Sequence, residues 1–118
     1  MSCNNQLKEN YGLFIGGEWR PASDGTTYQS TNPANGEVLT QCAQATKEDV
    51  DAAVAAAWKA FPEWKKTTKE ERAAILDKIA DRVEENQEWL AKVETMDNGK
   101  PIRETMAIDV PYSIRHFR

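Results

Sequence analysis

The segment Glu94-Thr95-Met96-Asp97-Asn98-Gly99-Lys100-Pro101 decides how the C-terminal half of this chain folds. Glycine readily adopts the left-handed conformation that follows many helices, and proline often stands just beyond a helix end. Gly99 and Pro101 are therefore expected to end one helix. A new helix is expected to follow from Pro101 and to be still helical at Arg118.

Three predicted helices precede this stop. Thr46 with Asp49, and Thr68 with Glu71, match the capping box, in which two side chains satisfy free N–H groups at a helix start. Asn86 is expected to cap the third helix, and Pro62 is expected to lie at the end of the first. Apolar residues then recur at three- and four-residue steps, as one helix face requires: Val50, Val54, Trp58 and Phe61, then Ile75, Ile79 and Val83, then Leu90, Val93 and Met96.

The front of the chain predicts strands and turns. The apolar stretch 13–15 and the stretch 18–20 flank Gly16-Gly17, a pair that can form a tight hairpin turn. A strand over 28–31, a turn over 32–36 and a strand over 38–43 follow. Residues 1–11 are expected to be a polar tail, and no parallel-sheet pattern is visible.

Composition narrows the classes of protein that this sequence can encode. The 118 residues carry 15 Lys and Arg against 19 Asp and Glu, so the net charge is −4, which argues against a general nucleic-acid binder. There is no run of 18 apolar residues, so no membrane span is expected. The first residues lack the apolar region of a secretory signal. Two cysteines without a CxxC motif are typical of a reduced, cytoplasmic protein.

The apolar content is low for an independent core. Leu, Ile, Val and Phe together make about 17% of the chain, below the roughly 20% at which disorder becomes a concern. Much of the remainder is alanine between Ala52 and Ala60, which buries little area per residue. Ile114 and Phe117 would also leave an apolar face without a partner. We therefore expect the chain to pack against a larger body.

The sequence contains no complete active site. It lacks both the GxGxxG and the GxxxxGK[ST] phosphate-binding patterns. His116 is the single histidine, and one histidine cannot build a zinc site without suitably spaced partners. Cys42 lies in a predicted strand of small residues and is best interpreted as a core residue. We therefore assign no catalytic and no cofactor-binding residue within the chain.

Asp97 leaves two interpretations open. It stands where the last carbonyl groups of a helix lack partners, and a carboxylate there is unfavourable against the helix dipole. It is either part of an ordinary helix stop or a ligand of a bound cation, since hard cations prefer such oxygen ligands.

Several ordered blocks resemble the start of NAD(P)-dependent aldehyde dehydrogenases. The resemblance covers residues 12–118, and its most specific block is Glu94 to Pro101. The other blocks are Leu13-Phe14-Ile15-Gly16-Gly17-Glu18-Trp19, Thr31-Asn32-Pro33-Ala34-Asn35-Gly36-Glu37-Val38, Lys47 to Val54, Phe61-Pro62-Glu63-Trp64 and Glu71 to Asp81. The stretch from Gly99 to Arg118 looks most like bacterial acetaldehyde and other short aliphatic aldehyde dehydrogenases.

The resemblance implies an α/β, aldehyde dehydrogenase-like fold of which this chain is the N-terminal piece. A hairpin and short strands would be followed by three to four helices that pack on a Rossmann-like cofactor domain. Residues 12–118 would be the N-terminal part of that domain, without the catalytic and oligomerisation parts. In the family, the nucleophilic cysteine, the general-base glutamate and the cofactor-binding lysine all lie beyond position 118.

The implied activity is oxidation of a small aldehyde to a carboxylic acid with NAD or NADP. The implied partners are the remainder of such a chain and further copies of it in a homo-oligomer, with no nucleic acid and no membrane. By the same resemblance, Ser30 and Asp97 match a monovalent cation site for K⁺ or Na⁺. Ile108, Asp109 and Tyr112 match the lining of the aldehyde entrance, although ordinary helix packing also explains Ile108 and Tyr112.

A rival hypothesis comes from a different class of protein. The same segment could serve as a non-catalytic helical interaction module, or be the product of a decayed gene. The isolated chain is expected to be inactive under either hypothesis, because it carries no nucleophile, base or phosphate-binding loop.

Overall fold

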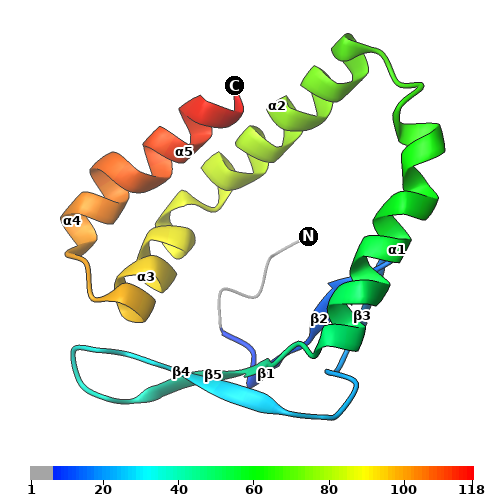
Figure 1. Ribbon diagram of the computed structural model, residues 1–118. Coiled ribbons are helices and arrows are strands. Elements are labelled where there is room, and N and C mark those ends of the chain that lie inside the picture. The colour runs from blue at the N-terminus through cyan, green and yellow to red at the C-terminus, as the bar shows by residue number, and fades with distance from the viewer. Residues whose placement is uncertain (1–6) are drawn as a thin grey trace. The chain divides into compact units, whose positions relative to one another are not determined.

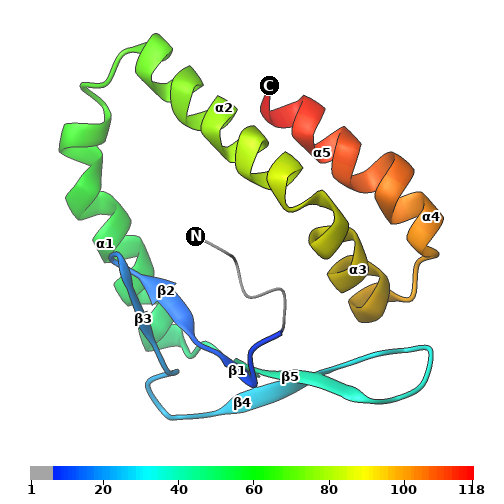
Figure 2. The same ribbon diagram turned by 180° about the vertical axis from the view of Figure 1, so that it is seen from behind.

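The computed structural model describes residues 7–118, which Figures 1 and 2 show from opposite sides. The chain divides into two compact units that alternate along the sequence. One unit combines residues 7–30 with residues 38–66, and the other combines 31–37 with 67–118. Each unit is therefore built from separate stretches of sequence.

A three-stranded sheet contains β1 (Asn10–Tyr11), β5 (Val38–Ala43) and β4 (Thr27–Thr31), in the order β1-β5-β4. β1 is parallel to β5, with Asn10 opposite Gln41. The expected polar tail over 1–11 is therefore wrong at its last residues, and so is the expected absence of parallel pairing. The Gln41 N–H donates to the Glu9 carbonyl at 2.9 Å, so this stretch finds backbone partners that its composition does not reveal.

The glycine pair forms the predicted hairpin. β2 (Leu13–Ile15) and β3 (Glu18–Arg20) are antiparallel, with Ile15 opposite Glu18. A two-residue turn of this kind needs positive φ at both central positions, and Gly16 and Gly17 have φ of 64° and 90°. The prediction is confirmed.

The first long helix, α1 (Lys47–Trp64), begins at the predicted capping box. Asp49 is 4% exposed, and its carboxylate accepts the backbone N–H groups of Thr46 and Ser23 at 2.9 and 3.1 Å. These hydrogen bonds hold the pKa of Asp49 below its ordinary value. Pro62 lies inside the helix, which continues to Trp64, so the expected end at Pro62 comes two residues too early.

The second unit is mostly helical. It contains α2 (Lys69–Glu85), α3 (Gln87–Asn98), α4 (Ile102–Glu104), a π-helical turn η1 (Thr105–Asp109) and α5 (Val110–Phe117). The capping box of Thr68 and Glu71 is confirmed, and so is the left-handed Gly99, with φ of 79°. Asn86 precedes α3 but does not cap it, because its Nδ2 donates to the Arg82 carbonyl at 2.8 Å and so closes α2.

The core of this unit lies where α5 runs beside α2 and α3 (Figures 1 and 2). Ala80 and Ala91 are fully buried against Val110 and Ile114. Small alanine side chains bring the helices close together, so α2 covers Ile114. The expectation of an open face at Ile114 is therefore wrong, whereas Phe117 remains 39% exposed. Within the described residues, no helix is both long enough and apolar enough to cross a membrane.

Candidate functional site

The residues expected at a substrate entrance lie on one helical segment. Ile108 and Asp109 belong to η1, and Tyr112 lies in the first turn of α5. The Ile108 and Tyr112 side chains are more than half exposed, whereas Asp109 is half-buried. The aliphatic side chain of Ile108 and the aromatic side chain of Tyr112 are thus exposed to solvent, whereas the Asp109 carboxylate is partly covered.

Asp109 is tied to Lys100, which follows the stop of α3. The Lys100 Nζ lies 2.7 Å from Asp109 Oδ1 and 2.6 Å from Oδ2. The hydrogen bond to Asp109 raises the pKa of Lys100, so the ammonium keeps its proton and compensates the carboxylate. This pair fixes the loop between α3 and η1, and it is suited to holding structure rather than to transferring a proton.

The π-helical turn has further polar contacts to α3. Thr105 is fully buried, and its Oγ1 donates to the Ile102 carbonyl at 3.1 Å and lies 3.0 Å from Thr95 Oγ1. The Gln87 Nε2 donates to the Met106 carbonyl at 3.0 Å. Sequence reasoning missed these contacts and the Lys100 ion pair, because a helix prediction does not show which residues the widened turn brings to α3.

The Tyr112 ring is held by its helix neighbours. The His116 ring packs edge-on against it with centroids 4.3 Å apart, and the Arg115 guanidinium lies 5.3 Å from its centroid. His116 Nδ1 is 2.8 Å from the Tyr112 carbonyl oxygen, which fixes the imidazole. Tyr112 is therefore an exposed aromatic side chain whose orientation is restricted by its neighbours on α5.

The two residues expected to hold a cation lie in different units. Ser30 is in β4, and Asp97 is the exposed penultimate residue of α3. In the part of the chain that the structure describes, no group of three or more His, Cys, Asp or Glu side chains could hold a metal ion. One carboxylate does not supply the oxygen shell that a hard cation prefers. A monovalent cation can also be held by backbone carbonyls, so the assignment of Ser30 and Asp97 to a cation site stays a prediction.

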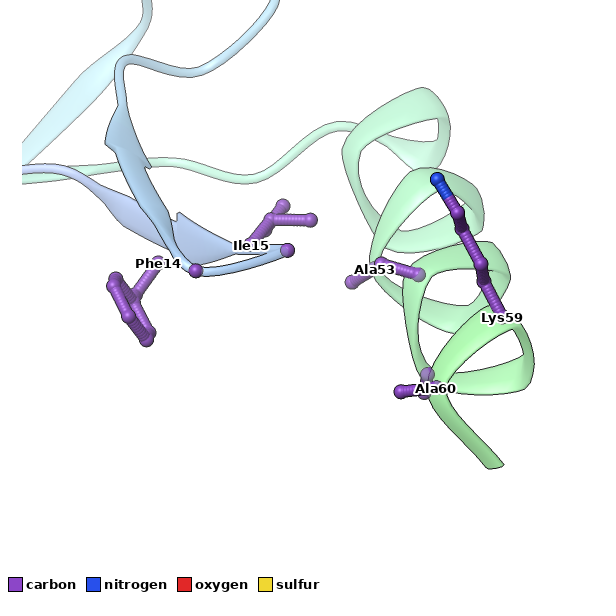
Figure 3. Close-up of a pocket in the computed structure, with 9 residues that line it drawn as sticks. Phe14, Ile15, Ala53, Lys59 and Ala60 are labelled. Carbon is purple, nitrogen blue, oxygen red and sulfur yellow. The ribbon is translucent and has the colours of Figure 1, made fainter. Parts of the chain in front are cut away.

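The first unit contains an open, mostly apolar groove between its hairpin and α1. Figure 3 shows Ile15 and Ala53 facing each other across it, while Phe14 points away from α1. The turn glycines and further alanines complete the lining, and Lys59 contributes the one charged group. The groove has no nucleophile, carboxylate or imidazole, so its chemistry fits packing rather than catalysis.

Comparison with known proteins gives a consistent result. Residues 19–118 match the model of the aldehyde dehydrogenase family. The chain is 53% identical over 113 residues to aldehyde dehydrogenase B of Escherichia coli, and 51% identical over 112 residues to an aldehyde dehydrogenase of Deinococcus radiodurans. These alignments cover 96% and 95% of this chain but 22% of each relative. The NAD⁺ complex of an aldehyde dehydrogenase from Bacillus cereus superposes with a TM-score of 0.90 at 40% identity, over 95% of this chain and 23% of that one.

Proposed function

The chain belongs to the aldehyde dehydrogenase family, and from this premise we propose that it forms the N-terminal part of an enzyme that oxidises aldehydes to carboxylic acids. The mixed α/β segment matches the N-terminal part of solved aldehyde dehydrogenases, and it spans about a fifth of the length of the relatives. In this proposal residues 12–118 belong to the cofactor-binding domain. Catalytic groups, NAD or NADP, and the contacts of a homo-oligomer belong to the rest of the protein.

The exposed apolar face of α1 carries this proposal. Val54, Trp58 and Phe61 are each 46% exposed or more, and with Ala57 they line a shallow apolar depression. An apolar surface of this kind usually marks an interface. We assign it to the remainder of the family-length chain, because the alignments leave more than three quarters of each relative outside this segment.

The proposed substrate is a short aliphatic aldehyde. Ile108 and Tyr112 offer an apolar wall to a carbon chain, and Lys100 neutralises the neighbouring Asp109 carboxylate. A small uncharged aldehyde would therefore meet no unpaired carboxylate at Asp109. The role of this chain is positioning, because the residues that react with the aldehyde lie elsewhere in the enzyme.

A chimera tests the proposal directly. The matching segment of Escherichia coli aldehyde dehydrogenase B would be replaced by this chain, and NADH formation with short and long aliphatic aldehydes would be measured. We expect an active chimera whose KM for aldehydes changes on Tyr112→Ala. Tyr28→Ala is the matched control, since Tyr28 is 52% exposed against 55% for Tyr112 but lies in β4.

The outcomes separate the two parts of the proposal. An inactive chimera that still folds and assembles would contradict the assignment to the enzyme and would favour a non-catalytic interaction module. An active chimera in which Tyr112→Ala and Tyr28→Ala behave alike would contradict the entrance role.

A further inference from the structure

The π-helical turn has a local cause in the sequence. Pro111 stands inside the continuous helical run from Ile102 to Phe117. A proline in a regular helix has no N–H to donate, and its ring collides with the carbonyl four residues earlier. Here the Val110 N–H donates to the Thr105 carbonyl five residues earlier, which widens the helix just before the proline ring. The extra residue in this turn relieves the collision.

The widened turn leaves one carbonyl in need of a donor. In a regular helix the Met106 carbonyl would accept the Val110 N–H, but that group is directed at Thr105. The next residue, Pro111, has no N–H. Gln87, the first residue of α3, supplies the missing donor through its Nε2 at 3.0 Å. The contact joins residues 19 apart in sequence and is partly shielded from solvent.

We infer that Gln87 is a positioning residue, which stabilises the π-helical turn and so sets the direction of Ile108, Asp109 and Tyr112. One residue of an α-helix corresponds to a rotation of about 100°. If the turn became regular α-helix, the side chains that follow it would therefore rotate about the helix axis relative to those that precede it. The structural part of this inference stands alone, and its consequence for aldehydes depends on the function proposed above.

A double-mutant cycle in the chimera with Escherichia coli aldehyde dehydrogenase B tests the structural part. Urea unfolding would be measured for the wild type, Gln87→Leu, Pro111→Ala and the double variant. We expect Gln87→Leu to reduce the folding equilibrium constant about fivefold, as the loss of one hydrogen bond does. In the Pro111→Ala background the helix can become regular and the Val110 N–H can reach Met106. The same substitution should then cost less than about twofold, and equal costs in both backgrounds would overturn the inference.

Gln87→Glu gives a second test that preserves side-chain size. An ionised glutamate cannot donate to the Met106 carbonyl, whereas a protonated one can. The stability deficit of this variant relative to wild type should therefore shrink as the pH falls through the glutamate pKa. An effect of the helix dipole alone would have the opposite sign, because a negative charge is favourable at a helix N-terminus. A deficit that grows on acidification would contradict the hydrogen-bond role.

The consequence for substrate is tested in the chimera with Escherichia coli aldehyde dehydrogenase B. Gln87→Leu should raise KM for a bulky aldehyde several-fold relative to acetaldehyde and leave kcat nearly unchanged, with Tyr112→Ala measured beside it. If Tyr112→Ala alters KM and Gln87→Leu does not, the positioning role is wrong while the proposed entrance stands. If neither alters KM in an active chimera, the entrance fails and the positioning role fails with it.

Discussion

Replacing Gly99 by alanine is expected to destabilise the helical unit through two separable effects. Gly99 has φ of 79°, a left-handed conformation that costs a residue with a Cβ about 1–2 kcal/mol. The added Cβ would also lie 3.0 Å from Pro33 Cγ, which is tighter than ordinary van der Waals contact. Because the proline ring is stiff, this crowding should add about 1–3 kcal/mol, the usual cost of overpacking.

Gly36 provides a matched control within the same unit. Its φ is 76°, but a Cβ built there meets nothing within 4 Å. Gly36→Ala should therefore cost only the conformational term of about 1–2 kcal/mol. The entropy that alanine removes from the unfolded chain is similar for both substitutions and cancels in the comparison.

Urea unfolding of the chimera with Escherichia coli aldehyde dehydrogenase B, followed by far-ultraviolet circular dichroism, measures both costs. Gly99→Asn separates the two effects, because asparagine tolerates the left-handed conformation yet keeps the Cβ beside Pro33. We expect Gly99→Ala to be the least stable, Gly99→Asn to be intermediate and the wild type to be the most stable. Equal costs for Gly99→Ala and Gly36→Ala would show that the contact with Pro33 contributes nothing, and negligible costs for both would refute the argument from φ.

Four further predictions concern caps, acid stability, cations and activity. Thr68→Ala should cost about 1 kcal/mol as the loss of an N-cap; Thr46→Ala should cost more in the same urea assay, because Thr46 Oγ1 also lies 2.7 Å from Ser23 Oγ. The lowered pKa of Asp49 contributes stability that is present above the ordinary aspartate pKa of about 3.9 and is lost as the pH falls through the folded-state value. In acid titrations followed by circular dichroism, the Asp49→Asn variant should therefore lose less stability than the wild type as the pH falls. In the complete enzyme, potassium should raise Tm more than an equal ionic strength of a bulky organic cation does, and Asp97→Asn should remove most of that difference. An unchanged potassium effect would leave Asp97 as part of a helix stop. The rigorously purified 118-residue chain should not reduce NAD or NADP with any aldehyde; reduction abolished by Cys42→Ala would overturn this expectation.

The sequence predicted those features whose causes lie within a few neighbouring residues. Both capping boxes join residues three apart, and the hairpin turn and the Gly99 stop each depend on glycine at one local position. The same local reasoning misplaced the end of α1 at Pro62 and assigned a cap to Asn86. The Asn86 side chain bonds to the Arg82 carbonyl instead, a choice that the residue type alone does not reveal.

Features that depend on distant partners could not be predicted in this way. The pairing of Asn10 with Gln41 and the burial of Ile114 against α2 join residues far apart in the sequence. The Lys100–Asp109 pair forms across the widened turn, whose location follows from Pro111. A proline inside a predicted helix was the available signal for that turn, but its effect depends on whether a donor such as Gln87 stands nearby.

The alternation of the two units along the chain has a consequence for synthesis on the ribosome. The strands and α1 of the first unit are complete once residue 66 has emerged, whereas residues 31–37 belong to a unit whose helices come later. Translation adds about 5–20 residues per second, so several seconds pass between the synthesis of residues 31–37 and that of the helices in the same unit. Its own hydrogen bonds suit it to that delay: the Asn32 N–H donates to the Glu37 carbonyl and the Gly36 N–H to the Asn32 carbonyl, each at 2.8 Å. Because these backbone groups are already hydrogen-bonded within the loop, they are not free to pair with other nascent chains while the helices are being made.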